Sequence, residues 1–120
     1  MPFMLLYLDI GSRKRFDPEK IGRTLIDAGA VECRAPGEDC VAVFDYELAP
    51  DITTIRIPSG LATVDLDGTG PASLDIAWRI QKDYAEPIHL IDEQYTFDFV
   101  IRDFDSLESL TQAANKAMNE

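Results

Sequence analysis

Hydrophobic and polar positions follow two patterns along the chain, one typical of strands and one typical of helices. An apolar run rich in strand formers predicts a first strand. Alternation and short apolar runs bounded by glycine and proline predict six more. The seven predicted strands cover residues 3–10, 31–35, 41–44, 52–57, 61–66, 88–91 and 95–101. The second and third flank the turn Pro36-Gly37-Glu38-Asp39, so they are expected to form a hairpin.

Helical spacing of apolar residues appears in three segments, and the first two have recognisable ends. Asp17 is the predicted N-cap of the first helix, with Pro18 at the first helical position and Gly29 as the stop signal. The second helix opens after Thr69-Gly70-Pro71 and ends before Pro87. Its wide apolar arc predicts a helix that lies flat on a sheet.

The third helix is predicted to follow Asp105 as N-cap, with Glu108 at the spacing of a capping box. Its inner face is expected to carry Leu107, Leu110, Ala114 and Met118. Together the elements predict one α+β domain over residues 1–120. We expect an antiparallel or mixed sheet of about five to seven strands, with three helices mainly on one face.

Charge narrows the classes of partner. The chain has a formal net charge of −11, and residues 65–120 alone hold 12 acidic and 4 basic side chains. Such a field repels nucleic acid and anionic membrane, and it attracts basic proteins. The alternative is that acidity only keeps the protein in solution.

Two cysteines, Cys33 and Cys40, are too few for a disulfide framework or a four-ligand zinc site. Their spacing suggests that they face each other across the predicted hairpin, and we expect both to be reduced. The first ten residues show no basic region and no cleavage site of a signal peptide. We therefore expect a cytoplasmic protein.

The string Val64-Asp65-Leu66-Asp67-Gly68-Thr69 resembles the first motif of haloacid-dehalogenase-type phosphatases. The resemblance implies Asp65 as nucleophile, Asp67 as general acid/base and a magnesium ion. That family needs a parallel sheet behind the motif, and only 51 residues follow Thr69. The alternative is a strand-to-helix turn with no catalytic role. We expect no cofactor and no bound metal.

Two other features carry ordinary interpretations. His89 is the only histidine and lies in a short apolar strand, so we expect a structural residue with a hydrogen-bond partner. The basic run Arg13-Lys14-Arg15 is too small, against the acidic total, to indicate nucleic-acid binding. We expect it to be a solvated loop.

A cluster of acids and aromatics near the C-terminus favours protein binding. Acidic charge speeds the approach of a basic partner, and aromatic rings supply contact area. The candidate partner-binding residues are Asp92, Glu93, Tyr95, Asp98, Asp103 and Asp105. Phe97 and Phe99 are expected to face the core, whereas the orientation of Tyr95 stays open.

The segment from Gly68 to Ile101 contains a glycine turn, an amphipathic helix and the strings P-I-H-L-I-D-E and Y-T-F-D-F. In these features it resembles small acidic immunity proteins of bacterial toxin–immunity systems, such as those of contact-dependent growth inhibition. The resemblance implies a non-enzymatic cytoplasmic protein that binds and neutralises a cationic toxin domain, often a nuclease. Two alternatives stay open: a magnesium-dependent phosphatase-like enzyme using Asp65 and Asp67, and a regulatory ligand-binding module.

Overall fold

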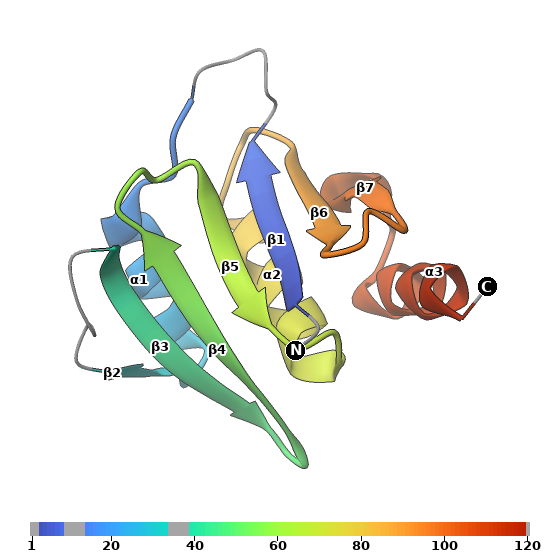
Figure 1. The fold of residues 1–120 in the computed structure, drawn as a ribbon, viewed down its shortest axis with the longest axis horizontal. Coiled ribbons are helices and arrows are strands. Elements are labelled where there is room, and N and C mark those ends of the chain that lie inside the picture. The colour runs from blue at the N-terminus through green and yellow to red at the C-terminus, as the bar shows by residue number, and fades with distance from the viewer. Residues whose placement is uncertain (1–2, 9–13, 34–38, 120) are drawn as a thin grey trace.

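A computed structural model describes residues 3–8, 14–33 and 39–119 of the chain. Over these residues it shows a seven-stranded antiparallel sheet with three α-helices, so the predicted α+β class is confirmed (Figure 1). The strands are β1 (Phe3–Leu8), β2 (Val31–Cys33), β3 (Cys40–Leu48), β4 (Asp51–Pro58), β5 (Thr63–Asp67), β6 (Ile88–Asp92) and β7 (Asp98–Val100). The helices are α1 (Pro18–Asp27), α2 (Pro71–Lys82) and α3 (Leu107–Met118), and a 3-10 turn, η2 (Ile101–Asp103), precedes α3.

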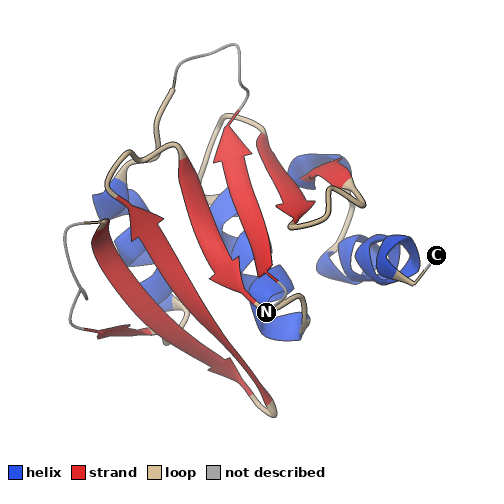
Figure 2. Ribbon diagram, viewed as in Figure 1, coloured by secondary structure: helices blue, strands red, loops and turns tan. Residues whose placement is uncertain are grey.

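The N-terminal strand lies in the interior of the sheet, whose order is β2-β3-β4-β5-β1-β6-β7. Strand β1 is antiparallel to both β5 and β6, so β5 and β6 run in the same direction with β1 between them. By the same reasoning β1 and β4 run in the same direction with β5 between them. The β5–β6 pair is joined directly by α2, which is the split βαβ arrangement, whereas the connection from β1 to β4 contains α1 and the strands β2 and β3. Right-handed crossovers then place α1 and α2 on one face, and Figure 2 shows both behind the strands.

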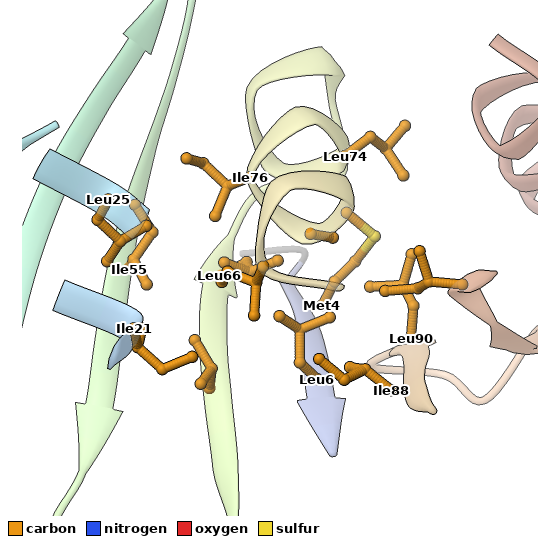
Figure 3. Packing of buried hydrophobic residues seen from close by; sticks show 14 of the residues in the cluster. Met4, Leu6, Ile21, Leu25, Ile55, Leu66, Leu74, Ile76, Ile88 and Leu90 are labelled. Atoms are coloured by element: carbon orange, nitrogen blue, oxygen red, sulfur yellow. The ribbon is translucent and has the colours of Figure 1, made fainter. Parts of the chain in front are cut away.

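The core lies between that face of the sheet and the helices. Alternate residues of the strands point into it: Met4 and Leu6 from β1, Leu66 from β5 and Leu90 from β6 are each fully buried. Figure 3 shows Met4 and Leu66 close to helix α2, which contributes Ile76 to the same cluster. The opposite face of these strands carries no helix in Figure 1 and is called the open face below.

Helix ends agree with the sequence at α1 and differ at α3. The side chain of Asp17 accepts hydrogen bonds from two first-turn amides, as predicted. At α3 the predicted N-cap Asp105 is wrong, because the cap is Ser106. Ser106 and Ser109 bond reciprocally, side chain to backbone, so Ser109 fills the capping-box position one residue beyond the predicted Glu108.

Strand lengths differ most from prediction in the outer parts of the sheet. Strand β3 extends to Leu48, beyond the predicted end at 44, because it pairs residue by residue with β4. Strand β7 is only Asp98–Val100, and the predicted range 95–101 is wrong at its start. The amides of Tyr95 and Thr96 donate to the backbone and side chain of Asp92, which makes a turn of this segment. The predicted positions 9–10 and 34–35 lie outside the described residues.

The cysteines do not face each other. Cys33 pairs with Val43 on β3, whereas Cys40 pairs with Pro58 on β4. Cys40 precedes Val43 by three residues, about 10 Å along an extended strand. Both thiols are free, and a disulfide between them would require the backbone to move.

Across the described residues, none of the helices combines the length and the apolar character that a bilayer crossing requires.

Candidate functional site

The open face is hollowed along β1 and β6 into a cavity of about 740 Å³. Its apolar lining includes Leu5 of β1 and Ile91 of β6, which are directly paired in the sheet register. Because side chains alternate along a strand, these residues face away from the core side chains Leu6 and Leu90. The volume falls within the ~300–1,000 Å³ typical of small-molecule sites.

The two ends of the cavity carry different chemistry. At the C-terminal end of β1 the cavity is lined by Lys14 and Arg15. The next residue, Phe16, is buried and its amide donates to the carbonyl of Leu61, which fixes this segment beside β5. At the other end lies Tyr95, in the turn that follows β6.

A cluster of three polar side chains stands on the open face at the edge of this cavity. The hydroxyl of Tyr7 donates to Oδ2 of Asp98 at 2.5 Å, and Nδ1 of His89 donates to Oδ1 at 2.9 Å. The rings of Tyr7 and His89 are stacked with centroids 4.6 Å apart. Desolvation raises the pKa of Asp98, but the hydrogen bonds from Tyr7 and His89 outweigh it and leave that pKa below its ordinary value.

This cluster orients His89 as a carboxylate orients the histidine of a catalytic triad, and it gives the histidine the partner that a structural role requires. Among the described residues no hydroxyl or thiol of serine, threonine or cysteine is hydrogen-bonded to His89, so a nucleophile is not paired with it.

Tyr95 is the most exposed large hydrophobic side chain of the described residues, with 77% of its surface accessible. Its backbone has φ of 55°, in the left-handed region that costs residues with a side chain about 1–2 kcal/mol. The chain therefore places a large ring in solvent at a backbone position that glycine or asparagine would occupy more easily. Phe97, by contrast, is buried, and Phe99 packs against the core, as predicted.

The six predicted partner-binding residues do not form one continuous surface. Tyr95 and Asp98 line the open-face cavity, and Glu93 is exposed in the same turn. Asp92 is buried, and its carboxylate accepts from the amide of Thr96, so it stabilises the turn. The other two predicted acids, Asp103 and Asp105, are exposed beyond β7. Asp105 lines a separate hollow with Trp78 and Arg102.

The phosphatase-like string occupies the end of β5, and its geometry differs from what that chemistry needs. Its strand belongs to an antiparallel sheet, whereas the resemblance implied a parallel one. Asp67 is paired with Arg56 at 2.6 Å, and Asp65 accepts from Thr63. Burial raises the pKa of Asp65, although Thr63 and Arg56 act in the opposite direction. Over the described ranges there is no group of three or more side chains suited to a metal ion.

The turn after this string is built around a contact with β4. Asp51 accepts from the amide of Ala72 at 2.9 Å and so caps α2 from outside the helix. A Cβ atom on Gly70 would lie 2.6 Å from the Asp51 carboxylate, so a side chain there would push that carboxylate away from the amide of Ala72. Gly68 has φ of 87°, which also favours glycine. These contacts account for both glycines without a catalytic role.

Sequence reasoning missed Tyr7, Lys14 and Arg15 as site residues. The signal for Tyr7 was present, since alternation places it on the face opposite Leu6. Its neighbours depend on the pairing of β1 with β5 and β6, which residue patterns do not specify. The basic run Arg13-Lys14-Arg15 is expected to be a solvated loop, and Arg13 lies outside the described residues. Lys14 and Arg15 are exposed, but they also line the cavity.

Comparison of the chain with known proteins finds no matching family model, no matching curated protein and no matching solved structure.

Proposed function

We propose that the chain is a non-enzymatic cytoplasmic protein that binds and neutralises a basic protein, in the manner of the immunity proteins it resembles. The observation that carries the proposal is the exposure of Tyr95. Its aromatic side chain is 77% exposed, and its backbone is held in a strained conformation. Such strain is typical of functional positions. Burial of this ring by a partner would remove its apolar surface from water and so stabilise the complex.

An exposed tyrosine suits a basic partner for two reasons. Its ring buries a large area at little conformational cost, and tyrosine is enriched among the residues that dominate binding energies. Its face also attracts lysine and arginine through cation–π contact, worth about 0.5–2 kcal/mol. Glu93, exposed two residues earlier, adds negative charge next to the ring.

The rest of the acidic half contributes to the approach of the partner rather than to close contact. Residues 65–120 carry a net charge of −8, with 12 acidic and 4 basic side chains. A field of this sign accelerates association with a cationic protein, and salt screens it over about 8 Å at physiological ionic strength. Asp92 is excluded from the contact because it is buried.

The proposal expects a basic toxin domain to be encoded beside the gene of this chain, and the test uses that domain as a purified, catalytically inactive protein. Its association and dissociation rates are measured with wild type, Tyr95→Ala and Glu93→Gln by biolayer interferometry at several salt concentrations. Tyr95→Ala should mainly raise the dissociation rate, by about tenfold or more, since it removes an anchor. Glu93→Gln should mainly slow association, and only at low salt.

The matched control is Glu19→Gln combined with Glu32→Gln, two exposed acids on α1 and β2 away from the turn. Circular dichroism confirms that each variant is folded. Equal losses in the control and in the turn variants would remove Tyr95 and Glu93 from the binding surface. Absence of binding between the wild-type chain and the adjacent toxin would overturn the proposed function itself.

A further inference from the structure

The open-face cavity has features that a protein-binding surface does not need. We propose that it binds a small organic carboxylate with an apolar body, with the carboxylate at Lys14 and Arg15 and the apolar body along β1 and β6. This inference goes beyond the proposed function: it concerns a small ligand, and it rests on Lys14, Arg15, Leu5 and Ile91 and shares only Tyr95 with the proposed protein-binding surface.

The first argument is the shape and lining of the cavity. Leu5 and Ile91 are neighbours across the β1–β6 ladder and present adjoining apolar side chains to the hollow. A cavity of about 740 Å³ takes a ligand of ordinary metabolite size. Burial of hydrocarbon against these residues contributes ~25 cal/mol per Å² of apolar surface removed from water.

The second argument is the sign of the charge at one end. The chain has 11 basic side chains against 22 acidic ones, yet two consecutive basic residues line this cavity. Within the described residues no carboxylate is paired with Arg15. Lys14 lies 3.5 Å from Glu86, and 55% of its side chain is exposed, so an anion can approach it from solvent. Two cations at the mouth of an apolar hollow are complementary to a carboxylate head group.

The third argument is that the backbone carrying these cations is held in place. Phe16 follows directly, is buried, and donates its amide to Leu61 at 2.9 Å. The backbone at 14–16 is thus fixed beside the start of β5, where Ala62 and Thr63 also line the cavity. A positive charge fixed beside a hollow binds more strongly than the same charge on a free tail, because less entropy is lost on binding.

The orientation of the ligand follows from the other polar groups. Asp98 is ionised, and each of its oxygens accepts one hydrogen bond, from Tyr7 or from His89, so a carboxylate is repelled from that position. The head group is therefore directed to Lys14 and Arg15, and the apolar end points towards the ring of Tyr95. A ligand with a cationic head would be repelled by Lys14 and Arg15, and at the other polar position it would have to share Asp98 with Tyr7 and His89.

A second hollow provides an internal comparison. Between α1 and the β2–β3 pair, a hollow of about 440 Å³ is lined by Glu19, Asp27 and Glu32 with a single cation, Arg23. Its charge is opposite to that required for a carboxylate. Specific carboxylate binding should therefore leave this hollow untouched.

The experiment titrates the ¹⁵N-labelled chain with octanoate, octanol and octylammonium, three probes with the same apolar body and different head groups. Chemical-shift changes at the amides of Leu5, Tyr7 and Ile91 report the cavity. Octanoate should bind about tenfold more tightly than octanol, and octylammonium more weakly than either. In the double variant Lys14→Gln, Arg15→Gln, octanoate should fall to the affinity of octanol.

Lys20→Gln with Arg23→Gln, on α1, removes the same charge elsewhere and should leave octanoate binding unchanged. Equal affinity for the three probes would overturn the carboxylate assignment. Shifts confined to the α1–β2 hollow, shifts spread over the whole surface, or no shifts up to the solubility limit of octanoate would overturn the site. The head-group series on the wild-type chain decides the question even where a variant is misfolded, and none of these results depends on the adjacent toxin.

Discussion

Tyr46 on β3 donates a hydrogen bond of 2.5 Å to Asp75 on α2, and both side chains are buried. Arg79, one turn along α2, donates to the same carboxylate oxygen at 3.1 Å. A buried carboxylate is tolerated only when donors replace the water it has lost. This contact therefore links helix α2 to the sheet through a charged group whose partners come from both layers.

We predict that Tyr46→Phe lowers the free energy of unfolding by about 1–3 kcal/mol, because Asp75 loses a donor while remaining buried. Urea denaturation at pH 7 measures the change. Tyr7→Phe is the matched control: its hydroxyl also bonds a carboxylate, but that of Asp98, which is 51% exposed, so a smaller loss is expected. If Tyr46→Phe lowered the free energy of unfolding no more than Tyr7→Phe does, burial of the carboxylate would not determine the cost of losing a donor.

The positive φ of Tyr95 predicts that glycine at this position gives a more stable chain than alanine does. Tyr95→Gly should raise the free energy of unfolding relative to Tyr95→Ala by up to about 1 kcal/mol, since only glycine adopts φ of 55° without cost. Comparison with alanine removes the contribution of the ring from the result. Thermal and urea unfolding of the two variants decide it, and a more stable alanine variant would refute the claim of strain.

The half-buried carboxylate of Asp65 predicts a pH dependence. Its pKa in the folded chain is raised, so its ionised form is disfavoured by folding and its contribution to stability decreases as pH rises through that pKa. Asp65→Asn should therefore be neutral or stabilising at pH 7, by no more than about 1 kcal/mol because solvent screens the side chain. The difference from wild type should shrink as pH falls towards 4.

Asp67→Asn supplies the contrast, because that change breaks the ion pair with Arg56 and should destabilise the chain at pH 7. Unfolding curves between pH 4 and pH 7 measure both variants. A stabilising Asp67→Asn would contradict a stabilising ion pair between Asp67 and Arg56. A strongly destabilising Asp65→Asn would contradict an unfavourable ionised form of Asp65.

The phosphatase alternative is tested separately. We expect no magnesium-dependent turnover of p-nitrophenyl phosphate by the wild-type chain, because Asp67 is paired with Arg56 and the strand that carries it belongs to an antiparallel sheet. Turnover that is present in wild type and absent in Asp65→Asn would support the hypothesis of a magnesium-dependent phosphatase-like enzyme.

The thiol of Cys33 should react slowly with alkylating reagents. It donates to the carboxylate of Asp45 at 3.2 Å, and this hydrogen bond, with desolvation, raises the pKa of the thiol. Since the thiolate is the reactive form, Asp45→Asn should speed iodoacetamide labelling of Cys33 at pH 8 several-fold. Peptide mass spectrometry follows the rate. Glu47→Gln on the same strand is the control and should leave it unchanged.

Much of the fold follows from local pattern. Asp17, Pro18 and Gly29 set α1 correctly because N-caps and C-terminal glycines act through bonds within a few residues. At α3 two good N-cap residues, Asp105 and Ser106, stand next to each other, and local chemistry alone does not choose between them. Ser106 is the N-cap in the structure because the side chain of Ser109 also accepts a hydrogen bond from the amide of Ser106.

The site was less accessible to sequence reasoning because it depends on strand pairing. Asp92 and Asp98 look alike in the sequence, but one is buried in a turn and the other stands on the open face. Tyr7 and Asp98 are 91 residues apart and meet only because β1 and β7 both flank β6. Patterns of alternation predict which face a side chain occupies, but not which strand lies beside it.

The interior position of β1 has a consequence for the order of events during synthesis. Among the described strands, β1 pairs with β5 and β6, whose first residues follow Phe3 by 60 and 85 positions. At ~5–20 residues per second, translation takes roughly 4–17 s to supply the later partner. Until then the apolar segment that begins at Phe3 has no ladder to join, whereas the β3–β4 hairpin can zip locally. We therefore expect nascent chains arrested before Ile88 to be captured by chaperones, and synthesis of β6 to trigger closure of the sheet around β1.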